Sequence, residues 1–269
     1  MSDGLSIEQG IAHLPSGGKL YLTEEGEPIF PEGIVRMRPM TTQEEQLLAS
    51  VKTRASRDQV MFSLVGKCIV DEDAAKMSID DYLVGDVLYM LMVLRAVTWG
   101  PEYMFEVKCG ECEKKFMVEI KTPEDLRVFA FGRDEEVSEA IKVDPLPISK
   151  AKLTVRLLKV SDEKAIAEYA RKRGKDQTQV APYRFGRHIL TWDGKDMTPD
   201  EASKKYLKLH ARDAEALRNA ISDADCGIDL ALSEECAFCG SENDVDFEFT
   251  SDFFSSKSSA LRRRRRAAR

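Results

Sequence analysis

Two C-x-x-C pairs constrain this chain more than any other feature of its sequence. Cys109 pairs with Cys112 and Cys236 with Cys239, each among β-prone residues and each with a glycine inside or directly after the pair. Both sulfurs of such a short turn can face one ion, and two turns complete a tetrahedral site. Thiolates favour zinc, and four of them leave no open position for a substrate. We therefore predict a structural Zn²⁺ site whose ligands are Cys109, Cys112, Cys236 and Cys239.

Other uses of the two pairs stay open. Each pair could be a thioredoxin-like redox motif, although neither follows a strand and opens a helix. The pairs could form disulfides, although nothing in the sequence indicates an oxidising compartment, or they could be incidental. Of the remaining cysteines, Cys68 ends an apolar helical segment and is expected in the core, whereas Cys226 falls in a loop and has no assigned role.

The cysteine pairs end two stretches of similar sequence. A displacement of 120 residues lays Val35 on Val155 and Ser78 on Thr198. Both hydroxyl residues have an acid three positions later, so each is expected to cap the start of a long helix. The apolar stripe of the first such helix then falls on that of the second, with Val87, Leu91, Leu94 and Val97 over Leu207, Ala211, Ala214 and Leu217.

These recurrences predict an α+β fold of two tandem, mainly helical repeats. Each repeat would end in a zinc-knuckle β-hairpin, and the two hairpins would form one split zinc ribbon. The alternative, a chance match of two generic helical segments, stays open. The expected boundaries are an extended N-terminal arm over 1–33, a first repeat with its knuckle over 34–121, a linker over 122–150, a second repeat with its knuckle over 151–250, and a basic C-terminal tail over 251–269.

Composition excludes several classes of protein. Apolar residues make up 43% of the chain and charged residues 32%, which is normal for a globular protein with a real core. The longest dense apolar run, over residues 87–94, falls far short of the ~20 residues that cross a bilayer. The first residues show no signal-peptide pattern. We therefore expect neither a membrane span nor secretion.

Charge is unevenly spread along the chain. Forty basic and 47 acidic side chains give −7, and without the six arginines among the last eight residues the balance is 34 against 47, or −13. An acidic body is a poor nucleic-acid binder, because phosphate neutralisation needs a basic face. The tail is therefore a separate electrostatic object. It could be a flexible, solvated tail, or it could bind an acidic protein groove or nucleic acid through Arg262, Arg263, Arg264, Arg265 and Arg266.

The sequence offers little support for catalysis. His13, His188 and His210 stand in no metal-binding or catalytic spacing, and packing or surface roles are expected for them. Residues 16–19 superficially resemble a phosphate loop but lack its full pattern and a following helix signal. The acidic clusters have no catalytic partners at a readable spacing. We therefore predict that the protein is not an enzyme.

Several motifs together resemble a known family. They are the Leu14-Pro15-Ser16-Gly17 segment, the run over residues 35–41 leading into Glu44-Glu45, the long helix with Leu94-Arg95, the stretch over 103–112, and the closing aromatic stretch over 247–254. In these features the chain resembles the baseplate hub subunit or hub assembly chaperone family of T-even-type contractile phages. The resemblance spans about residues 30–250 and does not include the arginine tail.

The resemblance implies a structural or assembly protein of the phage tail baseplate, located in the virion and assembled in the host cytoplasm. It carries over no catalytic residues. Its implied partners are other baseplate hub, wedge or tail-tube proteins, with several copies in a symmetric assembly. Two other hypotheses remain: a zinc-ribbon nucleic-acid adaptor that uses the arginine tail, and a redox protein.

Overall fold

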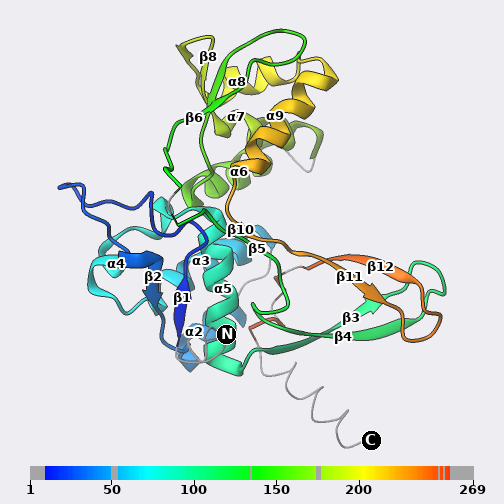
Figure 1. Cartoon of the computed structure of the whole chain (residues 1–269). Coiled ribbons are helices and arrows are strands. Elements are labelled where there is room, and N and C mark those ends of the chain that lie inside the picture. The colour runs from blue at the N-terminus through cyan, green and yellow to red at the C-terminus, as the bar shows by residue number, and fades with distance from the viewer. Residues whose placement is uncertain are drawn as a thin grey trace, which may run out of the picture. The chain divides into compact units, whose positions relative to one another are not determined.

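The computed structural model describes residues 10–49, 54–133, 135–173, 177–247, 249–250 and 252–254. The chain forms two compact units (Figure 1). The first unit contains Met1–Met77, Asp86–Ala130 and Gly227–Arg269, and the second contains Ser78–Gly85 and Phe131–Cys226. Both stretches that carry a cysteine pair therefore belong to the first unit. The described residues include eight α-helices and several small antiparallel sheets, a mixed α/β architecture.

The first unit begins with a packed segment. Strand β1 (Ile11–His13) pairs antiparallel with β2 (Ile34–Arg36), and the loop between them buries Leu14, Tyr21 and Phe30. The expectation of an extended arm over 1–33 is therefore wrong for residues 10–33, while residues 1–9 lie outside the described part of the chain. Apolar side chains spaced along a polar, glycine-rich stretch anchor it to the core.

One buried carboxylate helps to hold this loop. Asp86 accepts hydrogen bonds from the Ser16 backbone N–H at 2.9 Å and from the Tyr21 hydroxyl at 2.5 Å. It is the third residue of helix α5 (Val84–Trp99), where the helix dipole also favours negative charge. Burial raises its pKa, and the bonds from Ser16 and Tyr21 oppose that rise. The loop therefore depends on a partner about 70 residues away in sequence.

Helices make up most of the rest of the first unit. Helix α5 is buried on nearly all sides, including the predicted stripe residues Val87, Leu91 and Leu94, so it forms the centre of the core. It begins at Val84, because Ser78 caps the separate 3₁₀ helix η2 (Ile79–Asp81) instead, so the predicted start is wrong. The other helices are α2 (Thr42–Ala49), α3 (Arg54–Cys68) and α4 (Glu72–Lys76), with a short 3₁₀ helix η1 (Pro31–Gly33) before β2.

The second unit is built on a four-stranded antiparallel sheet in the order β6-β7-β8-β9. These strands are Ile141–Val143, Leu153–Val155, Ile189–Trp192 and Lys195–Asp196, and the helices are α6 (Val160–Arg173), α7 (Gln177–His188), α8 (Pro199–Tyr206) and α9 (Ala211–Asp223). The core of this unit gathers apolar side chains from the sheet and from α8 and α9, among them Leu153, Val155, Ile189, Trp192, Ala202, Leu217 and Ile221.

The predicted long helix after Thr198 is two helices. Thr198 does form a full capping box with Glu201, but α8 ends at Tyr206 and a new helix begins after His210. Lys204 and Lys205 lie in the last turn of α8, and Asp213 lies in the first turn of α9. Both sets of charges are favourable with the helix dipoles, so they favour one helix ending and another beginning here. The predicted match of the two apolar stripes at an offset of 120 is therefore wrong, because α5 has no continuous counterpart there.

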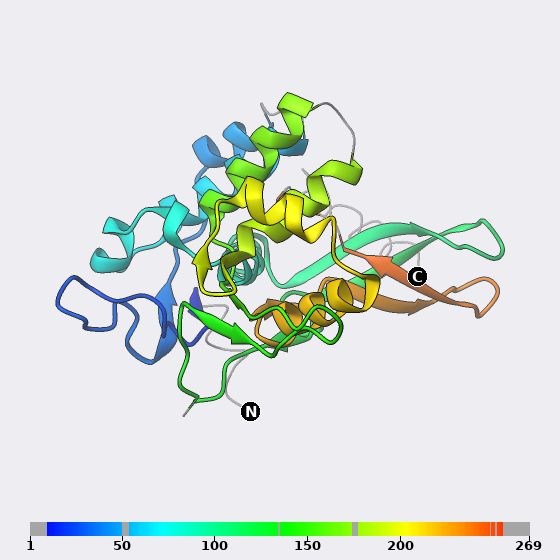
Figure 2. The same cartoon turned by 90° about the horizontal axis from the view of Figure 1, so that it is seen from above.

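Two hairpins of the first unit carry the cysteines. Strand β3 (Glu102–Lys108) pairs with β4 (Lys115–Lys121), and β11 (Ala231–Glu235) pairs with β12 (Glu242–Asp246). The two hairpins run side by side in both views of the molecule (Figures 1 and 2). A short pair, β5 (Val128–Phe129) with β10 (Gly227–Ile228), lies near the start of the second hairpin in sequence.

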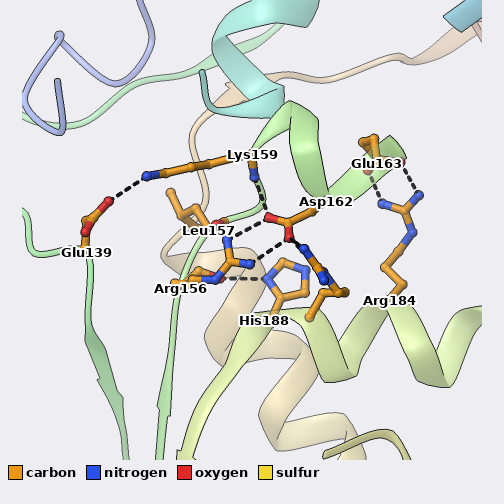
Figure 3. Close-up of polar contacts among 9 residues, drawn as sticks. Glu139, Arg156, Leu157, Lys159, Asp162, Glu163, Arg184 and His188 are labelled. Atoms are coloured by element: carbon orange, nitrogen blue, oxygen red, sulfur yellow. Dashed lines mark hydrogen bonds and ion pairs between the residues drawn. The ribbon is translucent and has the colours of Figure 1, made fainter. Parts of the chain in front are cut away.

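An arginine–carboxylate clasp with the same six-residue spacing is found in the described part of each unit. In the second unit, Arg156 donates to both carboxylate oxygens of Asp162 at 2.7 Å, and the Lys159 backbone N–H donates to the same carboxylate at 2.9 Å (Figure 3). The Arg156 backbone N–H reaches the His188 carbonyl at 2.8 Å. Arg187 also contacts Asp162, which makes this the more heavily paired of the two clasps.

The clasp of the first unit has the same bonds at the same spacing. Arg38 donates to both oxygens of Glu44 at 2.9 and 2.6 Å, and the Thr41 N–H donates to Glu44 at 2.7 Å. The Arg38 backbone N–H reaches the Cys68 carbonyl at 2.8 Å. The bond from Thr41 to Glu44 confirms half of the capping box predicted there. In both units the clasp fixes the passage from a strand into a helix.

Candidate metal centre

Each cysteine pair lies in the tight turn that closes its hairpin. In the first turn, Cys109 N–H donates to the Lys114 carbonyl at 3.0 Å and Glu113 N–H donates to the Cys109 carbonyl at 3.1 Å. In the second, Cys236 N–H donates to the Ser241 carbonyl at 2.8 Å and Gly240 N–H to the Cys236 carbonyl at 2.9 Å. The two turns therefore have the same hydrogen-bond pattern.

A left-handed residue follows each pair. Glu113 has φ +57° and Gly240 has φ +71°. Glycine adopts this conformation without strain, whereas glutamate does so at a cost. The glycine that marked the second pair in the sequence thus has a conformational role. We refer to the turns over residues 109–114 and 236–241 as the first and second knuckles.

The four sulfurs meet between the two knuckles. All four Sγ atoms lie within 4.8 Å of one another. Cys109 and Cys239 are 3.7 Å apart at sulfur, and so are Cys112 and Cys236. Zinc–sulfur bonds of about 2.3 Å in a tetrahedron place sulfurs roughly 3.8 Å apart, so the cluster has the size that a zinc ion requires. The four predicted ligands are brought together and are compatible with a zinc site.

The cluster is only partly shielded from solvent. Cys109 and Cys236 are buried, Cys112 is half-buried and Cys239 is exposed. Phe238, between the second pair of cysteines, is 58% exposed, and the Lys114 ammonium lies 5.0 Å from its ring centroid. An ion can therefore enter from the side of Cys239 without opening the core.

Hydrogen bonds already favour the thiolate form at part of the cluster. The Ser241 hydroxyl lies 3.1 Å from the sulfurs of both Cys109 and Cys239. Together with the Cys112 backbone N–H, it lowers the pKa of Cys109 to about 5. The Lys114 backbone N–H lowers the pKa of Cys112, but burial and the neighbouring thiols outweigh it and raise that pKa to about 11. A cation that binds all four sulfurs would displace the remaining protons.

An aromatic cluster joins the two hairpins below the knuckles. Phe105 of β3 lies edge-on to Phe247 at 5.8 Å between ring centroids, and Tyr103 lies edge-on to Phe247 at 5.7 Å and to Phe253 at 5.1 Å. Phe253 and Phe254 are fully buried. Arg95 of α5 lies over the rings of Tyr103 and Phe253. The hairpins are thus held both at their base and at their tips.

The other candidate residues are not gathered into a site. His188 is buried, its Nδ1 lies 2.9 Å from the Arg156 carbonyl oxygen, and burial lowers its pKa. His210 precedes α9 without a side-chain capping bond. The Ser16 N–H, which a phosphate loop would offer to an anion, is taken by Asp86. The cysteine cluster is the one potential metal-binding group found among the described residues. Arg262–Arg266 lie outside the described part of the chain.

Two polar residues beside the cluster were missed by sequence reasoning. Ser241 contacts the sulfurs, and the Asn243 carboxamide accepts a hydrogen bond from Gly110 N–H at 2.9 Å. Their only sequence signal is their position directly after the second pair. Of the other cysteines, Cys68 is buried as predicted, and Cys226, which had no assigned role, is also buried.

Comparison with known proteins decides the family. The profile of the family described as T4 bacteriophage base plate protein matches residues 10–255, which is most of the chain. The chain belongs to this family. No curated protein and no solved structure matches the chain.

Membership in the T4 base plate family confirms the resemblance drawn from the motifs at the level of a T4-type baseplate protein. The family is a structural component of the phage, so the protein is part of the tail baseplate of the virion and interacts with other baseplate proteins. No helix in the described part of the chain is both long and apolar enough to cross a bilayer. Within this baseplate protein, the cysteine cluster is the feature with an evident chemistry.

Proposed function

We propose that this baseplate protein is a zinc-stapled adaptor of the baseplate hub, acting either as a hub subunit or as a hub assembly chaperone. One Zn²⁺ held by Cys109, Cys112, Cys236 and Cys239 would join hairpins from distant parts of the chain. The role is passive: the protein would present fixed surfaces to hub, wedge or tail-tube proteins and turn over no substrate. Several copies in a symmetric assembly would follow from a place in the hub.

The proposal depends mainly on the arrangement of the four sulfurs. Residues 113–235 separate the two pairs in sequence, yet all four sulfurs lie within 4.8 Å of one another. Four thiolates fill the coordination shell of zinc, so the ion would stabilise the fold and leave no site for a reacting group. A structural ion that joins remote segments suits a protein that acts by presenting fixed surfaces to its neighbours.

We also propose that the chain is a tandem duplication whose hairpins form one split zinc ribbon. An offset of 127 residues relates Asp86 to Asp213 and relates the two cysteine pairs. Asp213 is the third residue of α9, and it accepts the backbone N–H groups of Ile148 and Ser149 just as Asp86 of α5 accepts that of Ser16.

The earlier parts of each proposed repeat agree at other offsets. Arg38 with Glu44 and Arg156 with Asp162 are related by 118 residues, and a Leu-Pro dipeptide precedes each proposed repeat, at Leu14 and at Leu146. Offsets that change between elements are expected of repeats that have gained and lost loop residues. In this alignment the counterpart of α5 is α9.

The metal can be tested on purified protein. We expect about one zinc per chain by elemental analysis, released on chelation, and no zinc in a Cys109→Ser, Cys236→Ser double variant. The variant Cys68→Ser, which alters a cysteine outside the cluster, is the matched control and should keep its zinc. Wild-type protein that is fully folded and free of bound metal after growth with zinc would refute the staple.

The partner role needs a separate test. We expect the protein to co-purify with hub or tube proteins from infected cells. The arginine tail is proposed as one contact, so a version ending at Ala260 should lose part of this binding. That cut keeps Phe253 and Phe254, which are buried in the first unit. Undiminished binding by the shortened protein would refute a role for Arg262–Arg266.

A further inference from the structure

We propose that Asn243 is a positioning residue for the metal centre, which braces the two knuckles so that the four sulfurs stay together before an ion binds. This inference rests on the zinc site proposed above. Asn243 is not a ligand in this account. It acts through the backbone of both knuckles.

Both the oxygen and the nitrogen of the Asn243 carboxamide form hydrogen bonds. Its Oδ1 accepts the Gly110 N–H of the first knuckle at 2.9 Å. Its Nδ2 donates to the Ser241 carbonyl of the second knuckle at 2.8 Å, with the Glu234 carbonyl at 3.5 Å. A primary amide has its donor and its acceptor on two separate atoms, whereas an ionised carboxylate only accepts and a hydroxyl has both functions on a single oxygen.

The tips of the hairpins need such a brace because, among the described strands, none of one hairpin pairs with a strand of the other. Strands β3 and β4 form one two-stranded sheet, and β11 and β12 form another. Among the described residues, the ring-to-ring contact nearest the tip of the first hairpin is at Phe105, four residues or about 13 Å of strand before Cys109. Beyond that point the hairpins meet through side chains, and clustered thiolates would repel one another without a cation.

The brace is supplied by the second hairpin alone. The residue 127 positions before Asn243 is Phe116, which is buried and apolar. The first knuckle instead offers the bare Gly110 N–H, and a Cβ built on Gly110 would lie 3.9 Å from Asn243 Oδ1. The two knuckles therefore share a turn geometry but differ in the residue that links them.

The expected effect of losing this amide is a weaker apparent affinity for zinc. An amide that favours the docked tips raises the fraction of metal-free protein able to bind zinc, and apparent affinity is proportional to that fraction. Outer-shell residues of metal sites are typically worth 10–100-fold in affinity. We expect the apparent Kd for zinc of Asn243→Ala to rise by about 10–100-fold, while the four thiolate ligands remain the same.

The test uses the full chain, reduced and stripped of metal. Zinc is titrated in competition with a chromophoric chelator for wild type, Asn243→Ala and Asn243→Gln, which keeps the amide but displaces it by one methylene. Asp244→Ala is the matched control, because Asp244 is the next residue of β12 and is exposed. Co²⁺ at saturation then reports the ligand set through its thiolate charge-transfer bands.

Weaker zinc binding in both Asn243 variants, with wild-type affinity in Asp244→Ala and an unchanged Co²⁺ spectrum, would support the brace. Affinity within twofold of wild type in Asn243→Gln and Asn243→Ala would overturn it. A changed Co²⁺ spectrum would also overturn it, because Asn243 would then alter the ligand set itself. Wild-type protein that binds no zinc would overturn the metal centre and the brace together, which distinguishes that failure from failure of the brace alone.

Discussion

Removing the carboxylate of Asp162 should destabilise the second unit strongly. The Asp162 side chain is 1% exposed and accepts hydrogen bonds from Arg156, Arg187 and the Lys159 N–H. The two arginine side chains are only 24% and 21% exposed, so Asp162→Ala would leave two guanidinium groups largely buried without their shared partner. Breaking a buried ion pair on one side costs about 3–5 kcal/mol.

This free energy converts to a large shift in melting temperature. The second unit has about 100 residues, and an unfolding entropy of about 2.1 cal/mol/K per residue gives roughly 4.8 °C for each kcal/mol. Asp162→Ala should therefore lower the Tm of this unit by about 14–24 °C. Trp192, buried in the core of the second unit, reports its unfolding by fluorescence in a Trp99→Phe background, because the chain has two tryptophans.

An exposed ion pair on α6 provides the control. Lys172 and Glu168 are 69% and 53% exposed, so Lys172→Ala should cost less than about 0.5 kcal/mol. A shift for Asp162→Ala no larger than that of Lys172→Ala would refute the reasoning. The pH dependence provides a second check. Burial raises the pKa of Asp162, but the two arginines and the Lys159 N–H outweigh it, so its pKa is lowered. The stabilisation should be present at neutral pH and be lost as the pH falls below about 3.9.

Three further predictions concern the first unit. Gly33→Ala should lower the free energy of unfolding, measured in urea, by about 1–3 kcal/mol, because φ is +68° and a Cβ would lie 2.7 Å from the Gly17 backbone. Gly26→Ala, where φ is +84° and no atom lies within 4 Å of the Cβ, should cost less. Equal losses of stability in the two variants would contradict this reasoning. Chelation should make the four clustered thiols react with an alkylating agent, while Cys68 and Cys226, which are buried outside the cluster, stay protected until unfolding. Mass spectrometry of labelled peptides would report this, and equal labelling with and without chelator would count against the metal. The Arg38 guanidinium lowers the pKa of Glu44 to about 2, so the stability that this pair contributes should be lost as the pH falls from about 4.5 to 2. In Arg38→Gln, the free energy of unfolding should depend less on pH over that range. An unchanged dependence on pH would contradict the clasp.

Local sequence patterns predicted the cysteine cluster but not the polar residues beside it. The spacing within each pair and the glycine nearby predict a knuckle, and the number of cysteines predicts that two knuckles share one ion. The structure brings these four sulfurs together. The sequence did not indicate Ser241 or Asn243, because their roles depend on a facing hairpin more than 120 residues away.

The limits of pattern reading are clearest at the helices. The apolar stripe of α5 and the cap at Thr198 were readable, because burial periodicity and capping depend on residues three or four apart. The start of α5 and the break between α8 and α9 could not be predicted from such local patterns. Asp86 and Asp213 bind backbone N–H groups of loops that lie far away in sequence, and that pairing exists only after folding.

The sequence by itself determined the T4-type baseplate family, the four cysteines that cluster and the elements whose signals are local. Only the tertiary structure decided that residues 10–33 pack against the core and that Phe253 and Phe254 are buried beside Tyr103. The physical reason is that a polar, glycine-rich segment has no periodicity of its own. Its few apolar side chains become ordered only where a buried carboxylate or an aromatic cluster, contributed by another part of the chain, compensates the entropy lost on ordering.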